Sequence, residues 1–267
     1  MMTTIADISS FFASHTPLSL AEDWDNVGLL AGDPAQPVTK IMTCLTITAA
    51  SAAEAIHERA ELIVTHHPLP FKPLKRLTTE QTPGRLLWSL ARAGVAIFSP
   101  HTAFDSAAAG INQQLAEGIG LTQIQPLVPA KNDPNGLGSG RIGTLTKPIT
   151  LQEAAALLAN FLKIDGLQMV GEPNQKISRI GIACGSAGSF LPAAADSGCQ
   201  LLITGETTFH TCLEAEALGL SLLLPGHYAS ERFACEQLAV VLKNQFPGLE
   251  VWPSRAETDP VRWLPLG

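Results

Sequence analysis

The chain of 267 residues contains an internal repeat, and this feature constrains its fold more than any other. The segment KIMTCLTITAASAAEAIHERAELIVTHH, which starts at Lys40, aligns without a gap with RIGIACGSAGSFLPAAADSGCQLLITGE, which starts at Arg179. The offset that relates Lys40 to Arg179 also places Thr65 opposite Thr204. Self-similarity at a fixed offset predicts a duplicated architecture, with chance similarity between two generic strand–helix units as the alternative.

Each copy has the pattern of a strand, an Ala-rich helix and a second apolar strand. A further helix and a third strand follow in both copies, the third strands being GVAIFSP from Gly94 and GLSLLLPG from Gly219. Strands that alternate with helices predict right-handed crossovers and parallel pairing, and wholly apolar runs such as ELIVT and LLIT are typical of strands buried on both faces. We therefore predict a duplicated three-layer α/β/α architecture with two intertwined, pseudo-symmetric halves and mainly parallel sheets.

The repeat also predicts the domain organisation. The first half covers residues 1–124 and the second covers 151–267. Residues 125–150 are rich in Pro, Gly and Asn, which indicates a linker without an inserted domain. Its tail RIGTLTKP is compatible with a strand, and LQEAAALLANFLK, from Leu151, has the apolar spacing of an amphipathic helix.

Composition excludes several classes of protein. Hydrophobic residues make up 46% of the chain and charged residues 15%, so extended disorder is not expected. A net charge of −7 argues against general nucleic-acid binding, which needs clustered Lys and Arg. The five cysteines are scattered without a C-x-x-C pair, which indicates a reducing compartment rather than a disulfide scaffold. With no signal-peptide pattern and no apolar run long enough to span a bilayer, we expect a cytoplasmic protein without membrane association.

Three polar clusters follow predicted strands, at the carboxyl ends where ligands bind in open parallel sheets. In two of them a carboxylate lies four residues after a histidine, one helical turn away. Imidazole with carboxylate suits zinc, iron, manganese and similar ions. A capping carboxylate beside a buried histidine is the alternative for either cluster alone, and a surface pair is the alternative for adjacent histidines. Together the three favour a metal site: His66–His67, His101-x-x-x-Asp105 and His227-x-x-x-Glu231.

A fourth polar cluster, Glu206 with His210, follows the strand LLIT. These side chains suit proton carriers, partners of metal ligands or ligands themselves, and structural roles are equally compatible. His15 and His57 fall within predicted helices and are expected at the surface. No P-loop, dinucleotide-binding or nucleophile-elbow motif is present in the sequence.

Six motifs in this order resemble the Nif-three-like family of GTP cyclohydrolase I type 2 homologues: WDNVGLLAGDP, LIVTHHPLPF, HTAFD, ACGSAGSF, TGETTFH and GHYASE. The resemblance runs from about Leu20 to Trp252. It implies a duplicated α/β fold, assembly as a toroidal homohexamer and a dinuclear metal centre. By motif, the metal ligands of the family fall on His66, His67, Asp105, His227 and Glu231.

The sequence departs from the family pattern at two motifs. Ala103 and Phe104 stand where the family usually carries Asn-Leu, beside a ligand position rather than on it. Glu206 stands where Asp is common, which lengthens the reach of that carboxylate. Longer members of the family carry an extra domain midway, which the short segment 125–150 does not accommodate.

Residue pattern and resemblance together predict a metal-dependent hydrolase. Two divalent cations (iron, zinc, manganese or nickel) about 3.5–4 Å apart would lower the pKa of a bridging water towards ~7. The family label implies a small-molecule substrate, GTP or another nucleotide, with attack at C8 of guanine and release of formate. We expect His101, Glu206 and His210 to be catalytic residues that carry protons.

Two other functions are compatible with the same residues. One is hydrolysis of a phosphoester or amide at the same metal centre. The other is a non-enzymatic role as a metal-binding protein or a ring-shaped scaffold, because metal ligands alone do not show whether a substrate binds beside them.

Overall fold

The computed structural model describes residues 2–262, except 132 and 134. Contacts within the chain divide it into two compact units. The first unit consists of Met1–Ser10, Asn26–Ser99 and Cys235–Gly267, and the second consists of Phe11–Asp25 and Pro100–Ala234. The two halves inferred from the repeat, 1–124 and 151–267, have different bounds from these units and stay a prediction.

The first unit is built on a five-stranded sheet with the order β1-β4-β3-β2-β13. Neighbouring strands from β4 to β13 are parallel, and β1 is antiparallel to β4. The wholly buried β3 and β4 match the predicted apolar strands. The strands are β1 (Gly28–Ala31), β2 (Lys40–Cys44), β3 (Leu62–Thr65), β4 (Ala96–Ser99) and β13 (Glu250–Pro253).

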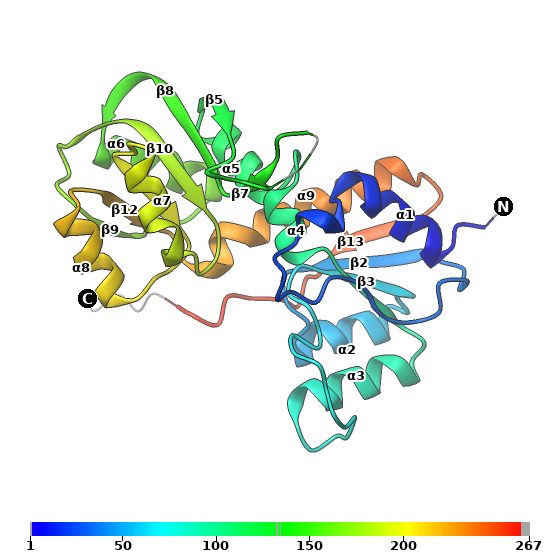
Figure 1. Ribbon diagram of the computed structural model, residues 1–267. Coiled ribbons are helices and arrows are strands. Elements are labelled where there is room, and N and C mark those ends of the chain that lie inside the picture. The colour runs from blue at the N-terminus through cyan, green and yellow to red at the C-terminus, as the bar shows by residue number, and fades with distance from the viewer. Residues whose placement is uncertain (1, 132, 134, 263–267) are drawn as a thin grey trace. The chain divides into compact units, whose positions relative to one another are not determined.

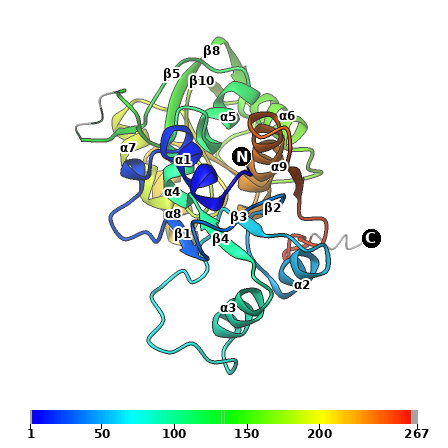
Figure 2. The ribbon, with the colours of Figure 1, turned by 90° about the vertical axis from the view of Figure 1, so that its right-hand side faces the viewer.

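Helices cover both faces of this sheet. On one face lie α2 (Ala49–His57) and α3 (Thr82–Arg92), as Figures 1 and 2 show. On the other face, the hydroxyl of Thr43 donates to the carbonyl oxygen of Cys235, in the part of α9 (His227–Gln245) that belongs to this unit. The helix α1 (Ile5–His15) begins the chain. The core between β2–β4 and the pair α2–α3 contains Met42, Cys44, Ala52, Ala55, Ile63, Leu86, Leu87, Leu90 and Ile97.

The second unit is built on a six-stranded sheet with the order β5-β8-β10-β11-β12-β9. The pairings β10–β11 and β11–β12 are parallel, and the flanking strands pair antiparallel. A short ribbon joins β6 (Val128–Pro129) to β7 (Gly138–Ser139). The strands of the sheet are β5 (Thr122–Gln125), β8 (Arg141–Thr150), β9 (Gln168–Val170), β10 (Lys176–Ala183), β11 (Leu201–Thr204) and β12 (Ser221–Leu224).

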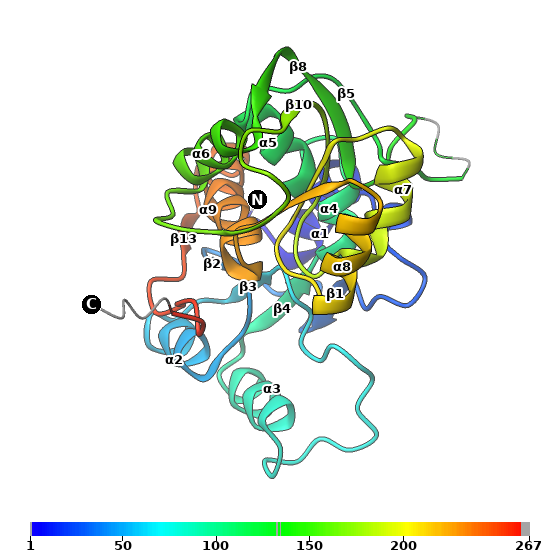
Figure 3. The ribbon, with the colours of Figure 1, turned by 90° about the vertical axis from the view of Figure 1, so that its left-hand side faces the viewer.

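Helices lie on both sides of the second sheet, with α7 and α8 on one side and α5 and α6 on the other (Figure 3). The predicted helix from Leu151 is confirmed as α6, and the end of the linker segment, which was only compatible with a strand, forms β8. A capping box between Thr150 and Glu153 starts α6. The helical elements are η1 (Leu18–Leu20), α4 (His101–Ser106), α5 (Ile111–Gly118), α6 (Leu151–Leu162), η2 (Gly188–Phe190), α7 (Leu191–Asp196) and α8 (Phe209–Ala217).

The sequence repeat reappears in the strand register. In the first unit Ile41 pairs with Leu62, and in the second unit Ile180 pairs with Leu201. The offset from Ile41 to Ile180 equals the offset from Leu62 to Leu201, and both equal the one that relates the two copies in sequence. The mixed α/β fold with largely parallel central strands is therefore confirmed. Among the described residues, no helix combines the length and apolarity needed to cross a membrane.

Candidate metal centre

The start of α9 carries a histidine and a carboxylate in contact. His227 follows β12 directly after Pro225 and Gly226, and its Nε2 atom lies 3.1 Å from Oε2 of Glu231. The other ring nitrogen of His227, Nδ1, lies 3.0 Å from Oε1 of Glu206. The hydrogen bond with Glu231 raises the pKa of His227, and although burial opposes it, the two carboxylate charges bring the value to about 9. The predicted spacing of four residues thus places imidazole and carboxylate side by side.

A glycine makes room for the Glu231 carboxylate. Gly185, after β10, has a φ of +67°, and a Cβ atom there would lie 2.3 Å from Oε1 of Glu231. The amide of Gly185 donates to Oγ of Ser230 at 3.1 Å, and that hydroxyl donates to the carbonyl oxygen of His227 at 2.8 Å. The close approach therefore requires glycine both for its backbone conformation and for its missing side chain.

Asp105, on α4, is a second carboxylate of this unit and is half-buried. The thiol of Cys184 donates to its Oδ1 at 3.2 Å. Asn112 holds the same region together, because its Nδ2 donates to the carbonyl oxygen of Asp105 and its Oδ1 accepts from the amide of Cys184. Burial and the negative charge of Glu231 raise the pKa of Asp105 to about 7, against the opposing charge of His101. Two carboxylates that repel each other in this way favour a bound cation.

His101 is the first residue of α4 and contacts a carboxylate that is not among the predicted site residues. Its Nδ1 atom lies 2.7 Å from Oδ1 of Asp25. The backbone of His101 has a φ of 27°, in the left-handed region, which costs about 1–3 kcal/mol in a non-glycine residue. The only signal for Asp25 in the sequence was its place in the motif WDN around Trp24, without any indication of its partner.

In the first unit, His66 and His67 follow β3 directly. Their backbone continues the pairing of β3 with the end of β2 and the residue after it. The amide of His66 donates to the carbonyl oxygen of Cys44 at 2.9 Å, and that of His67 donates to Leu45 at 2.8 Å. The two rings lie 5.1 Å apart between centroids, and each offers a nitrogen within 4.8 Å of one on the other ring. The hydroxyl of Thr46 lies 2.6 Å from Nδ1 of His67.

The loop that carries Thr46 is itself held by a buried carboxylate. Glu257 accepts from the amide of Leu45 at 2.9 Å and from that of Thr46 at 2.5 Å. Neither Thr46 nor Glu257 was selected from the sequence, because both lie far from His67 along the chain and belong to no recognisable motif. Hydrogen-bonding partners of this kind fix which ring nitrogen faces a metal.

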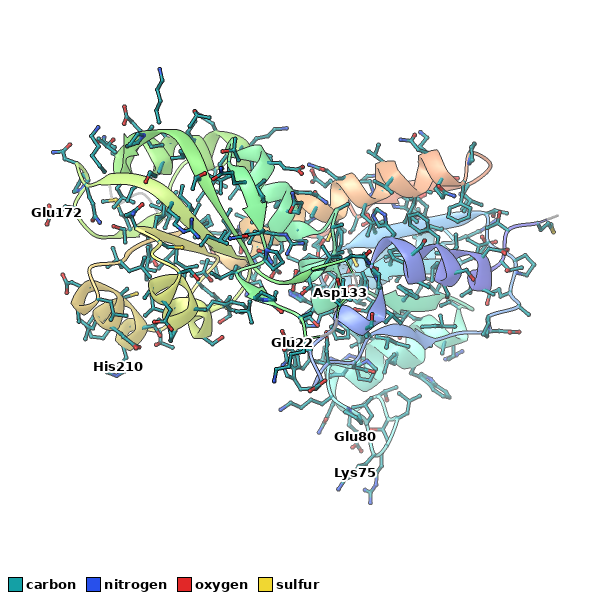
Figure 4. All side chains as sticks on the ribbon, turned by 45° about the horizontal axis from the view of Figure 1, so that its top comes forward. Glu22, Lys75, Glu80, Asp133, Glu172 and His210 are labelled. Atoms are coloured by element: carbon teal, nitrogen blue, oxygen red, sulfur yellow. The ribbon has the colours of Figure 1, made fainter. Side chains whose placement is uncertain are left out.

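The remaining predicted residues differ in their surroundings. Glu206 is 56% exposed and contacts His227, as described above. His210 is exposed on α8, and Figure 4 shows it at the periphery of the second unit. Of the histidines expected at the surface, His57 is exposed and His15 is half-buried.

The donor atoms of these residues suit a borderline transition metal. His66 and His67 in the first unit, and His227 and Glu231 in the second, belong to groups of side chains that could hold a metal ion. Imidazole nitrogens and carboxylate oxygens are ligands of zinc, iron, manganese and nickel. The chemistry of the residues therefore fits metal binding.

Comparison with known proteins gives the family. The model of the family Duf34/NIF3 (NGG1p interacting factor 3) matches residues 3–260. A "GTP cyclohydrolase 1 type 2 homolog" of Clostridium perfringens is 36% identical over 261 residues, which cover 97% of this chain and 98% of the relative. A "Protein NIF3 homolog" of Schizosaccharomyces pombe is 35% identical over 260 residues, 91% of each chain.

Solved structures agree with this assignment. The crystal structure of a Staphylococcus aureus protein has a TM-score of 0.88 at 28% identity. The match covers 98% of this chain and 99% of the other. A Bacillus cereus protein related to NIF3 has a TM-score of 0.89 at 22% identity, with 98% of this chain and 99% of the other covered, which shows a shared fold. The match to the family model over almost the whole sequence, and relatives at this identity, establish that the chain belongs to the Duf34/NIF3 family.

Proposed function

We propose that this protein is a metal-dependent hydrolase with a dinuclear centre. The proposed ligands are His66, His67, Asp105, His227 and Glu231. The observation that carries the proposal is the contact of 3.1 Å between His227 Nε2 and Glu231 Oε2, with the Glu231 carboxylate buried against the backbone of Gly185. A buried carboxylate in contact with an imidazole, in a protein whose relatives are named GTP cyclohydrolase 1 type 2 homologs, is best accounted for by a metal site.

Two bound cations would supply a water molecule of lowered pKa as the nucleophile at neutral pH. The residues of the chain would hold and orient this centre. Buried Glu231 and half-buried Asp105 would provide negative charge, and Glu206 would orient the ring of His227 through Nδ1. Thr46 would do the same for His67, leaving Nε2 as the atom directed to the metal. His101, Glu206 and His210 are the proposed proton carriers.

The proposed substrate is a small molecule, GTP or another nucleotide, and the relatives' names support GTP as the first to test. We also propose that the protein is cytoplasmic and forms a homo-oligomer, a homohexamer by family resemblance. Mass measurement of the purified protein by light scattering tests the assembly: a mass near six times 28.2 kDa supports a homohexamer, and the mass of one chain contradicts it.

Metal binding is tested by elemental analysis of purified protein. We expect two ions per chain in the wild type and loss of metal in Glu231→Gln, because the amide lacks the negative charge and the second ligand oxygen. Glu216→Gln is the matched control, since Glu216 is exposed on α8. An unchanged metal content in Glu231→Gln, or a wild type that takes up no transition metal, contradicts the proposal.

Activity is tested separately by incubating metal-loaded protein with GTP and measuring formate. Formate release supports the cyclohydrolase, and its loss in His227→Gln but not in His57→Gln ties the activity to the centre. Turnover of a phosphoester or amide instead of GTP moves the substrate assignment but keeps the hydrolase. Bound metal without turnover of any substrate class supports the metal-binding or scaffold role and contradicts the enzyme.

A further inference from the structure

The carboxylate of Asp25 is surrounded by donors. Its side chain is 1% exposed, and its Oδ1 lies 2.7 Å from Nδ1 of His101. Its Oδ2 accepts from both the amide and the hydroxyl of Thr102, at 3.1 and 2.5 Å. All of these residues belong to the second unit. Three hydrogen-bond donors on one buried carboxylate fix its position, which an incidental contact would not do.

The direction of each hydrogen bond follows from the chemistry of the groups. Burial would raise the pKa of Asp25, but hydrogen bonds from His101 and Thr102 lower it to about 2, so the carboxylate is ionised at neutral pH. An ionised carboxylate only accepts hydrogen bonds, so the hydrogen between Asp25 and His101 must lie on Nδ1. The Thr102 hydroxyl accepts from the amide of Glu22 at 3.0 Å, so its own hydrogen is directed to Asp25.

The ring of His101 is also restrained by its surroundings. The side chain is 9% exposed, and the indole of Trp24 stands edge-on to it with 6.0 Å between ring centroids. Its backbone holds the left-handed conformation at the first residue of α4. The imidazole therefore has a fixed position and a fixed partner on Nδ1.

We propose that Asp25 is a positioning residue that fixes His101 in the tautomer with hydrogen on Nδ1, so that Nε2 carries the lone pair of the neutral ring. The role in turnover rests on the proposed hydrolase. When water attacks the substrate, an O–H bond of the water breaks and its proton forms an N–H bond at Nε2. The adjacent Asp25 carboxylate stabilises the imidazolium, which then returns the proton to the leaving group. In Ser-His-Asp triads a carboxylate holds the histidine in the same way.

The tautomer is tested on metal-free protein labelled with ¹⁵N, by two-bond ¹H–¹⁵N correlation at a pH where the ring is neutral. We expect a protonated Nδ1 and an unprotonated Nε2 for His101 in the wild type. In Asp25→Asn the amide can donate to Nδ1, so we expect the hydrogen to move to Nε2. Asp23→Asn, an exposed neighbour with the same chemical change, should leave the spectrum unchanged.

A wild-type His101 with its hydrogen on Nε2 overturns the proposal, and this measurement needs no variant to fold and no substrate to be known. An unchanged tautomer in folded Asp25→Asn also overturns it. If the protein turns nothing over, the proposed hydrolase fails, while the tautomer measurement still decides the role of Asp25.

If a substrate is turned over, kinetics give a second readout. Asp25→Asn should lower kcat by about 10²- to 10⁴-fold with little change in KM, which is the range expected for general acid–base catalysis and for the wrong tautomer in a triad. In the His101→Gln background the same change should have no further effect on kcat, because both substitutions remove one function. Equal losses in both backgrounds would show that Asp25 acts independently of His101 and contradict the proposal.

Discussion

The guanidinium of Arg141 donates from Nη2 to the carbonyl oxygen of Ala107 at 2.6 Å, two residues beyond Asp105. It is one of five hydrogen bonds from this side chain, and the others go to Gln113, Gly138, Gly140 and Ser106. Arg141 is 1% exposed. A charged side chain with its five N–H groups directed to neutral oxygens therefore joins β8 and β7 to the end of the helix that carries Asp105.

Arg141→Lys should destabilise the protein by about 3 kcal/mol or more, because an ammonium cannot reach five acceptors and leaves buried carbonyl groups without their donors. The free energy of unfolding in urea measures this loss. Arg92→Lys, at an exposed position of α3, should change it by less than about 0.5 kcal/mol. Equal stability of the two variants would show that the Arg141 hydrogen bonds are replaceable.

Gly185→Ala should weaken metal binding. The new Cβ would lie 2.3 Å from Oε1 of Glu231, so the carboxylate must move, and we expect metal affinity to fall by about 10- to 100-fold. Gly198→Ala is the matched control: its φ of +71° imposes the same backbone strain, but no atom lies within 4 Å of the added Cβ. Competition with a chromogenic chelator measures both affinities, and equal losses would assign the effect to strain alone.

Metal-free protein should become more stable when Asp105 is replaced by Asn. The pKa of Asp105 in the folded state is raised to about 7, above its ordinary value of 3.8, so the folded state holds a proton that the unfolded state releases. Stability should therefore fall as the pH rises from about 4 to 7. Asp105→Asn should remove this fall and gain about 1–3 kcal/mol at pH 8. Chemical denaturation at several pH values tests this, with exposed Asp165→Asn as the control.

Glu54→Gln should have the opposite effect to Asp105→Asn: it should lower the free energy of unfolding at neutral pH. Burial would raise the pKa of Glu54, but hydrogen bonds from Ser254, Arg255, Ala256 and Trp252 lower it below 4.5. The stability that this carboxylate contributes is present above pH 4.5 and is lost as the pH falls through the lower folded value. Glu54→Gln should lower the free energy of unfolding by about 1–2 kcal/mol at pH 7, because its NH₂ group faces hydrogen-bond donors that the carboxylate accepted. The loss should be smaller at pH 3, because the wild-type carboxylate is then itself becoming protonated. Urea unfolding at both pH values measures the difference, and an equal cost at both would contradict the assignment.

The regular parts of the fold could be predicted from the sequence. The internal repeat anticipates the equal registers of Ile41 with Leu62 and Ile180 with Leu201, because buried parallel strands give uninterrupted apolar runs. The antiparallel strands β8 and β9 at the flanks of the second sheet have no such signature. Sheet order there is decided by tertiary packing, which local sequence does not encode.

The site was predictable where its geometry is local. Glu231 lies four positions after His227 on one helix, and helical periodicity brings the two side chains into contact. Asp25 and His101 are 76 residues apart, and Thr46 and Glu257 are 211 apart, so only the folded chain reveals these pairs. Arg141 was missed for another reason, since arginine is almost never fully buried and its sequence context resembles a surface strand.

The parallel pairing of β13 with β2 has a consequence for synthesis on the ribosome. The second unit has all its residues once Ala234 has been made, whereas the first unit still lacks Cys235–Gly267. Until those residues emerge, β2 is an edge strand with unpaired backbone groups, and Glu257 is not yet present to hold the loop at Thr46. Synthesis therefore begins with residues of the first unit but completes that unit last. In the meantime the nascent chain carries an aggregation-prone edge that chaperones would have to shield.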